Sequence, residues 1–318
     1  MIELVRVTGS FATSWLVIWF ASALVLLLFY PLVRRQLFNW HPATVSRLLL
    51  LLLAFPFLLS LSTSVMLFLP VVEDNLVSAH CHHNCQSHVP LVDSIWLSVT
   101  GLVVSLLMLL VVLRKLLFNL FTAKLLMSHL SHLAEDAGRW LLLQDAKPVV
   151  FTLGWWQNKV FITRGLLRRC SEQDIEIILR HEYEHGRRLD NVRLLLAKLF
   201  LLVLPVRLAD RFYADLHFLT ESACDFAAAE RYGELEVAET LLRVQKLVPR
   251  EFDYLNNPLT SAFTGSEVER RIMNLVKGPQ HFHNLCYVQT TFLLVFVVLS
   301  CTLVDPVHHG IEWLLKLL

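Results

Sequence analysis

The stretch ILRHEYEHGRRLDN, residues 178–191, contains two histidines four positions apart, with a glutamate directly after the first. Positions i and i+4 of an α-helix share one face, so His181 and His185 can present two imidazoles to the same Zn²⁺ ion. Glu182 lies beside the metal, where it can hold a water without acting as a ligand. Zinc lowers the pKa of that water, and the carboxylate removes its proton and passes it to the leaving amine. The pattern predicts the catalytic helix of a zinc peptidase; the alternative is a charged surface helix that fits it by chance.

The residues before this motif also indicate a helix. Ser171 stands in the N-cap position, acidic residues occupy the first turn, and apolar residues follow at helical spacing. Further upstream, the runs 149–153 and 159–163 are rich in β-forming residues and are separated by a glycine-containing turn, which predicts a β-hairpin. The hairpin could expose an edge strand that holds a substrate in extended form, with two buried core strands as the alternative.

A catalytic zinc ion needs a third protein ligand, and a second helix with an acidic residue is the best source of one. The segment ESACD, residues 221–225, offers two carboxylates one helical turn apart. We expect Glu221 to bind the metal and Asp225 to support a ligand histidine. Solvated helix acids are the alternative, since most Asp and Glu side chains are exposed. The apolar neighbours of both acids argue against it, because an unpaired acid is costly in apolar surroundings.

The composition predicts a membrane protein. The 318 residues are 55% hydrophobic and only 17% charged, against about 25% charged residues in an average soluble domain. A spanning helix needs about 20 apolar residues. The stretches that approach or exceed this length are 12–33, 48–69, 95–112 and 288–304. The net charge of +1 gives no reason to expect direct binding of nucleic acid, which requires concentrated basic surface.

The short loops predict the orientation, because Lys and Arg accumulate on the cytoplasmic side of a membrane. Basic residues follow the first and third apolar stretches: Arg34, Arg35, Arg47, Arg114, Lys115 and Lys124. The loop 71–93 contains acidic residues but no Lys or Arg. We therefore expect a multi-pass protein of a bacterial inner membrane. Its N-terminus and the loop 71–93 face outward, and residues 115–285 lie in the cytoplasm.

The expected fold class is mainly α, with four transmembrane helices and a cytoplasmic α+β zinc metallopeptidase domain that contains a small β-hairpin or sheet. Residues 1–121 would hold three transmembrane helices, and residues 122–285 the peptidase domain. Residues 286–318 would hold the fourth transmembrane helix and a short external tail. Within the domain, a helix is expected over 209–232. The apolar segment 194–206 is either a buried core helix or lies against the membrane part, by dipping into the interface or packing under the spans.

The hairpin, HEYEHGRRLD (181–190), ESACD (221–225) and the flanking apolar stretches together resemble the BlaR/MecR-type antirepressor metallopeptidases. These proteins are membrane gluzincins whose cytoplasmic zinc domain lies between the third and fourth transmembrane helices. The resemblance covers residues 10–305. It implies zinc ligands at His181, His185 and Glu221, a general base at Glu182, and supporting residues at Asp190 and Asp225. It also implies signal transduction through cleavage of a protein segment, such as a BlaI-like repressor or the chain itself, and a homodimer.

One feature departs from that family. Its β-lactam sensors carry a large penicillin-binding domain after the fourth span, whereas 14 residues follow position 304 here. We therefore do not expect direct β-lactam sensing, and a signal would enter through the loop 71–93, the membrane lipid or a partner. The alternative enzyme is a quality-control protease of the HtpX type, whose spans are arranged differently. A third hypothesis is a non-catalytic metal-sensing membrane protein, but a structural zinc site does not need a base such as Glu182.

The loop 71–93 contains the stretch HCHHNCQSH, residues 80–88. Thiolate and imidazole at this density suit copper or zinc. The candidate ligands of this external metal site are His80, Cys81, His82, His83, Cys85 and His88. A disulfide between the two cysteines and a plain polar connector are the alternatives.

The sequence also contains two lesser candidates. Arg270 and Arg271 are expected on a solvated helix face, with the alternative that one of them steadies an oxyanion. Tyr183 is expected to pack on the opposite side of the motif helix from the metal.

Overall fold

The computed structural model describes residues 2–69, 94–202, 204–247, 260–262, 268–278 and 285–317. The predicted external metal site at His80, Cys81, His82, His83, Cys85 and His88 lies outside the described residues. The chain divides into two compact units. The helical unit comprises Met1–Arg35, Leu51–Leu113 and Asn284–Leu318. The sheet-containing unit comprises Gln36–Leu50 and Arg114–His283.

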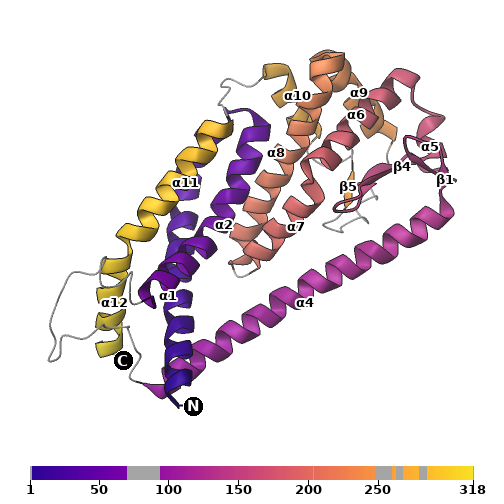
Figure 1. Cartoon of the computed structure of the whole chain (residues 1–318). Helices are drawn as coiled ribbons and strands as arrows, with labels where there is room; N and C mark the ends of the chain where they lie inside the picture. Colours follow the sequence, from indigo (N-terminus) through magenta and orange to yellow (C-terminus); the bar gives the residue numbers. More distant parts are fainter. Residues whose placement is uncertain are drawn as a thin grey trace. The chain divides into compact units, whose positions relative to one another are not determined.

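Among the described residues, three helices are long and apolar enough to cross a membrane: α1 (Ile2–Leu37), α2 (Pro42–Leu67) and α4 (Ile95–Leu133). Each contains most or all of one predicted apolar stretch. The fourth predicted stretch lies in α11 (Leu285–Thr302) and α12 (Val304–Leu317), which together form a bent pair with an angle of 43°. Figure 1 shows both members of this pair in yellow.

Helix α4 is longer than the sequence predicted. The expected span ended at Val112, but the helix continues without a break to Leu133. Its 39 residues correspond to about 58 Å at the usual rise per residue, close to twice the hydrocarbon thickness of a bilayer. The reason is local: the residues after Val112 are strong helix formers, and glycine and proline are absent until Gly138.

Helices α1 and α4 approach each other closely in the helical unit. A Cβ atom added at Gly9 would lie 2.4 Å from the backbone oxygen of Ser98, and one at Gly101 would lie 2.0 Å from Thr13 Oγ1. Small residues at a helix crossing allow such contact between backbones, which is the usual way in which helices pack within a membrane. The two glycines therefore fix where these helices cross.

The sheet of the second unit has five strands in the order β1-β2-β4-β3-β5. Strands β2 and β4 run parallel, and the other neighbours are antiparallel. The strands are β1 (Glu135–Asp136), β2 (Leu141–Leu143), β3 (Val150–Leu153), β4 (Lys159–Thr163) and β5 (Thr260–Ala262).

The predicted hairpin is confirmed as β3 and β4, with Phe151 paired to Phe161. Its turn requires Gly154, which has a φ of +126° and where an added Cβ atom would lie 2.5 Å from the backbone oxygen of Gln157. Strand β3 is buried along its whole length and is paired on both sides, since β5 covers its other edge. The alternative of buried core strands therefore describes β3, and its far edge is taken by a segment of the same chain.

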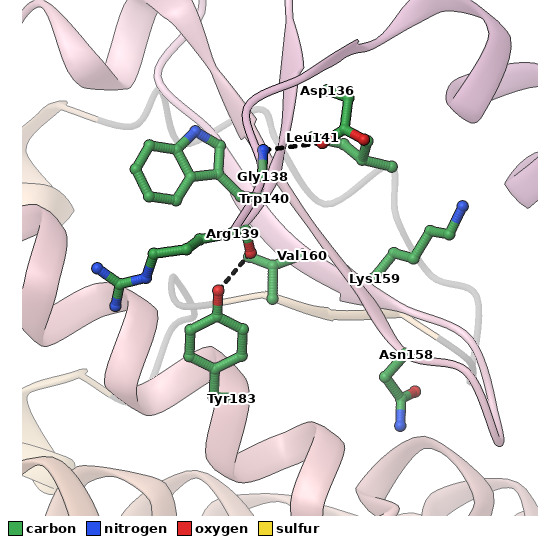
Figure 2. Close-up of a pocket in the computed structure, with 9 residues that line it drawn as sticks. All are labelled: Asp136, Gly138, Arg139, Trp140, Leu141, Asn158, Lys159, Val160 and Tyr183. Atoms are coloured by element: carbon green, nitrogen blue, oxygen red, sulfur yellow. Dashed lines mark hydrogen bonds between the residues drawn. The ribbon is translucent and has the colours of Figure 1, made fainter.

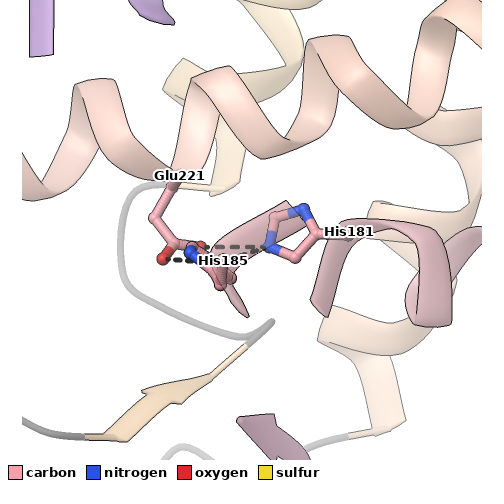
Figure 3. Close-up of side chains that lie close together, drawn as sticks. All are labelled: His181, His185 and Glu221. Atoms are coloured by element: carbon pink, nitrogen blue, oxygen red, sulfur yellow. Dashed lines mark hydrogen bonds and ion pairs between the residues drawn. The ribbon is translucent and has the colours of Figure 1, made fainter. Parts of the chain in front are cut away.

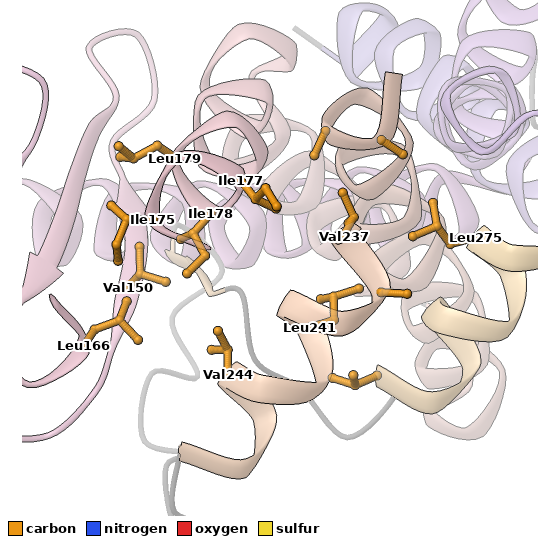
Figure 4. Packing of buried hydrophobic residues seen from close by; sticks show 14 of the residues in the cluster. Val150, Leu166, Ile175, Ile177, Ile178, Leu179, Val237, Leu241, Val244 and Leu275 are labelled. Atoms are coloured by element: carbon orange, nitrogen blue, oxygen red, sulfur yellow. The ribbon is translucent and has the colours of Figure 1, made fainter. Parts of the chain in front are cut away.

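Besides parts of α2 and α4, the described residues of the sheet-containing unit form these helices: α5 (Arg164–Leu167), α6 (Glu172–Arg188), α7 (Asp190–Leu201), α8 (Val206–Tyr232), α9 (Glu234–Leu247) and α10 (Val268–Lys277). Helix α6 packs against β3, β4 and α8, and α8 also contacts α7, α9 and α10. One apolar core joins the sheet to these helices, with Val150 from β3, Ile178 from α6, Leu241 from α9 and Leu275 from α10 (Figure 4).

The helix boundaries agree with the sequence signals. Ser171 forms a capping box with Asp174 at the start of α6, as its N-cap position predicts. Helix α8 ends before Gly233, near the expected residue, and begins three residues earlier than expected. The apolar segment after α6 forms α7, which buries Leu194 and Leu201. This outcome agrees with the buried core helix, one of its two predicted alternatives.

Candidate metal centre

The two histidines of the motif and Glu221 meet between α6 and α8. His185 Nε2 lies 3.3 Å from Glu221 Oε1, His181 Nε2 lies 3.5 Å from Glu221 Oε2, and the two Nε2 atoms are 3.1 Å apart. All three side chains are buried, and one potential ligand atom from each lies within 4.8 Å of the others. Figure 3 shows them pointing toward one another. Two imidazole nitrogens and one carboxylate are a donor set that fits Zn²⁺.

A carboxylate holds the other ring nitrogen of each histidine. His181 Nδ1 lies 3.0 Å from Asp225 Oδ1, and His185 Nδ1 lies 3.0 Å from Asp190 Oδ2. A proton on Nδ1 then leaves the lone pair of Nε2 directed toward Glu221. Histidines that bind metals are usually oriented in this way by a carboxylate or carbonyl behind them. The structure thus brings together the three residues that were expected to bind the metal and the two carboxylates that were expected to orient the histidines.

The backbone between α6 and α7 explains how Asp190 reaches its histidine. Leu189 has a φ of +54°, in the left-handed region, and it serves as both the C-cap of α6 and the N-cap of α7. A non-glycine residue in this region is uncommon and costs energy. This single residue separates the two helices, and Asp190 at the start of α7 lies 3.0 Å from His185 on α6.

Two arginines hold the Asp190 carboxylate, and Ser46 accepts a hydrogen bond from each of them. Arg193 Nη1 donates to Oδ1 at 2.7 Å, and Arg188 Nε donates to Oδ2 at 3.1 Å. Arg188 also donates to Ser46 Oγ at 2.8 Å. Burial would raise the pKa of Asp190, but the hydrogen bond to His185 and the charges of Arg188, His185 and Arg193 lower it to about 2. The carboxylate is therefore ionised at neutral pH.

Glu182 is fully buried on α6 and faces strand β3. Its Oε2 atom accepts a hydrogen bond of 2.6 Å from Thr152 Oγ1. Its Oε1 atom has no hydrogen-bond partner among the described residues. Burial raises the pKa of Glu182, against the opposing charges of His185 and His181. Such a carboxylate is suited to accept a proton, because its pKa is raised and only one of its two oxygens already accepts a hydrogen bond.

Glu221 is held in its ionised form. Burial would raise its pKa, but the neighbouring His185 and Arg271 keep the pKa well below its usual range. A carboxylate must be deprotonated to bind a metal ion, so this charge state is the one that a ligand requires.

The expectation for Arg271 was wrong. This side chain does not lie on a solvated face but is only 3% exposed, between Glu221 and Asp225. The sequence did contain a signal: Arg271 falls three residues after Val268 and four before Leu275, which are the buried apolar positions of α10. Arg270, one position earlier, is exposed as predicted and stacks on the ring of Phe218 at 3.8 Å.

The sequence also missed Cys224. Its Sγ atom lies 3.3 Å from His185 Nδ1, and together with Asp190 these residues form a second cluster of potential ligands. Burial raises the pKa of the Cys224 thiol to about 12, and two arginines already neutralise Asp190. A protonated thiol beside a neutralised carboxylate is a poor cation site, so the cluster of His181, His185 and Glu221 is the better candidate.

A separate cavity of about 260 Å³ lies on the Tyr183 side of α6 (Figure 2). Its lining includes Trp140 and Lys159 but none of the three candidate ligands. Tyr183 lines this cavity and not the candidate metal site, as its predicted side of the helix requires, but it is exposed and not packed as expected. Its hydroxyl donates to the backbone oxygen of Arg139. This cavity is therefore not the metal site.

Comparison with known families agrees with this geometry. Residues 137–249 match the model of peptidase family M48, whose members are metalloproteases and typically depend on zinc. The matched region contains α6 and α8, and hence all three candidate ligands, whereas Arg271 lies beyond it. No curated protein sequence matches the chain. Residues 137–249 are thus similar to an M48 metallopeptidase domain, and the described residues of the same polypeptide include three helices that are apolar enough to cross a membrane.

Proposed function

We propose that this protein is a membrane zinc endopeptidase, in which His181, His185 and Glu221 hold the zinc ion and Glu182 is the general base. The observation that carries the proposal is the position of a buried, partly available Glu182 carboxylate directly beside the three convergent ligand atoms. A structural zinc site would not need this carboxylate. When bound, zinc would lower the pKa of a water molecule and polarise the scissile carbonyl group.

Four residues of the chain would have separate roles in peptide hydrolysis. Glu182 would accept the proton of the attacking water and return it to the leaving amine. Thr152 would hold one oxygen of that carboxylate and leave the other directed at the reacting water. Asp225 and Asp190 would keep the two imidazoles in the orientation in which Nε2 is the ligand atom.

The substrate would be a protein segment in extended form. Strand β5 supports this proposal, because it pairs antiparallel with β3 and places Ser261 opposite Thr152. Thr152 in turn contacts Glu182, so one extended segment already lies in the strand position next to the base. Main-chain pairing with a sheet edge is a common way to hold a peptide. Among the proposed substrates, this arrangement favours processing of the chain itself over a separate repressor such as a BlaI-like protein.

Two arguments bear on the biological role. The distribution of Lys and Arg supports a peptidase domain on the cytoplasmic side of a bacterial inner membrane, with the N-terminus outside. Three apolar helices before the domain and a bent pair after it favour an antirepressor in signal transduction. A quality-control protease of the HtpX type is equally compatible with the M48 match. The two roles differ in substrate range: one or a few regulated cleavages for the antirepressor, and many damaged membrane proteins for the quality-control enzyme.

The test compares the wild-type chain with Glu182→Gln in native membranes, with new protein termini identified by mass spectrometry. The variant should retain its zinc and lose every cleavage that the wild type makes. Glu176→Gln is the matched control, because Glu176 lies on the same helix in an exposed ion pair with Arg139, and such pairs contribute little. Identical termini in wild type and Glu182→Gln would remove the peptidase proposal in favour of a non-catalytic metal protein.

A further inference from the structure

Arg271 is the one charged residue that α10 buries among the apolar side chains of the domain core. Its side chain is 3% exposed, and it shares a helix face with the buried Val268 and Leu275. A buried charge is costly unless it is paired and hydrogen-bonded. The partners of Arg271 must therefore stabilise its buried charge, and those partners belong to the candidate metal centre.

The guanidinium group bridges two carboxylates with different roles. Its Nε and Nη2 atoms donate to both oxygens of Asp225, at 2.8 Å and 2.6 Å. Its Nη1 atom lies 3.1 Å from Oε2 of Glu221. Asp225 holds the imidazole of His181 at 3.0 Å, so Arg271 contacts one candidate ligand directly and a second through one intermediate.

We infer that Arg271 is a positioning residue of the metal centre, which sets the orientation of Glu221 directly and that of His181 through Asp225. The inference rests on the proposed zinc site. It adds to that site a residue from α10, a helix outside the region that matches the M48 model. Arg271 itself touches neither the substrate nor the reacting atoms, and its effect should appear first in metal retention.

The geometry requires arginine and not only a positive charge. A planar guanidinium can donate two parallel hydrogen bonds to one carboxylate while its third nitrogen forms an ion pair with another, whereas an ammonium group is a single compact donor. Arg271→Lys therefore keeps the charge and loses the fixed angle between Asp225 and Glu221. This makes it the informative substitution, because it separates orientation from charge.

The experiment uses the full chain, purified in detergent, loaded with zinc and titrated with a chelating dye to obtain the zinc Kd. The midpoint of thermal unfolding of the metal-free protein is measured in parallel. Arg271→Lys should raise the zinc Kd by about 10- to 100-fold, the range found when residues that support metal ligands are changed. Arg270→Lys is the matched control on the same helix, because Arg270 is exposed and stacks on Phe218. Its zinc Kd should equal that of the wild type.

The two readouts distinguish positioning from general stability. If Arg271→Lys lowers the unfolding midpoint of the metal-free protein but leaves the zinc Kd at the wild-type value, Arg271 is a structural residue and the inference is wrong. If Arg271→Lys does not fold, the pair Arg271→Lys with Asp225→Asn replaces it, since the second change removes the unpaired charge. The pair should then bind zinc more weakly than Asp225→Asn alone, because it also loses the direct contact with Glu221; equal zinc Kd values in the two proteins would contradict the inference. A wild-type chain that binds no zinc would instead overturn the proposed function.

Discussion

Thr152 on β3 and Glu182 on α6 are joined by a hydrogen bond of 2.6 Å between Oγ1 and Oε2, and both side chains are buried. Thr152 Oγ1 also lies 3.3 Å from the backbone oxygen of Glu182. The sheet is thereby connected to the candidate base by one hydroxyl group. The strand that holds the Glu182 carboxylate is also the strand that pairs with β5.

Replacing Thr152 by valine tests this connection. Valine has nearly the same shape but cannot donate a hydrogen bond, so the Glu182 carboxylate would lose its fixed orientation. A hydrogen bond to a charged group contributes about 1.5–3 kcal/mol, and we expect kcat to fall by about 10- to 100-fold. The measurement is the rate of cleavage of the substrate identified with Glu182→Gln, together with the zinc content, which should not change.

Thr152→Ser is the control for this substitution because it restores the hydroxyl. It should recover most of the activity that Thr152→Val loses. Equal activity in the valine and serine variants would show that the hydroxyl has no part in the reaction.

Asp174 makes the stability of the domain depend on pH. Its carboxylate accepts hydrogen bonds from Thr240 Oγ1 at 2.9 Å and Arg243 Nη2 at 2.7 Å, in addition to the capping box with Ser171. Burial would raise the pKa of Asp174, but the hydrogen bonds from Ser171, Arg243 and Thr240 outweigh it and lower the pKa. A carboxyl group whose pKa is lower in the folded state stabilises that state above its unfolded pKa, and the contribution is lost as the pH falls through the folded pKa.

Asp174→Asn should therefore destabilise the protein by about 1–2 kcal/mol at neutral pH. The difference from wild type should begin to shrink as the pH falls below about 4, the ordinary pKa of an unfolded aspartate, and should disappear once the pH is below the lower pKa of the folded state. Thermal unfolding of the detergent-solubilised chain at several pH values measures it. Glu172→Gln, an exposed first-turn substitution on the same helix, should show neither effect. A difference that stays constant with pH would exclude the ionised carboxylate as its source.

The sequence predicted the parts of the site that follow from local periodicity. His181, His185 and Glu182 lie within one helix, and the spacing of a helix places them without knowledge of the fold. Glu221 could be proposed because a zinc ion needs a third ligand, although 36 positions separate it from His185. The hairpin and the capping box were predictable for the same local reason.

Contacts between distant segments were not predictable in this way. Arg271 reads as a charged residue on a short polar helix, and only its place between Val268 and Leu275 indicates burial. The role of Thr152 depends on how β3 packs against α6, which no local pattern contains. The left-handed Leu189 has no sequence signature either, since glycine or asparagine is the usual residue at such a position.

The crossing of α1 and α4 offers a test of the helical unit. At Gly9 an added Cβ atom would lie 2.4 Å from the backbone oxygen of Ser98, which cannot move aside without shifting the helix. At Gly310, on α12, an added Cβ atom would meet none of the described residues within 4 Å. Alanine is about 1 kcal/mol more favourable than glycine in a helix. Without the clash, both substitutions to alanine would therefore be neutral or stabilising.

We expect Gly9→Ala to lower the midpoint of thermal unfolding and Gly310→Ala to leave it unchanged or raise it slightly. Overpacking typically costs about 1–3 kcal/mol, which exceeds the gain in helix propensity at Gly9. The measurement is unfolding of the full chain in detergent, with zinc content followed in parallel to show that the sheet-containing unit is intact. Gly9→Ala at wild-type stability would mean that α1 and α4 do not cross at this glycine, and the small residues there would need another explanation.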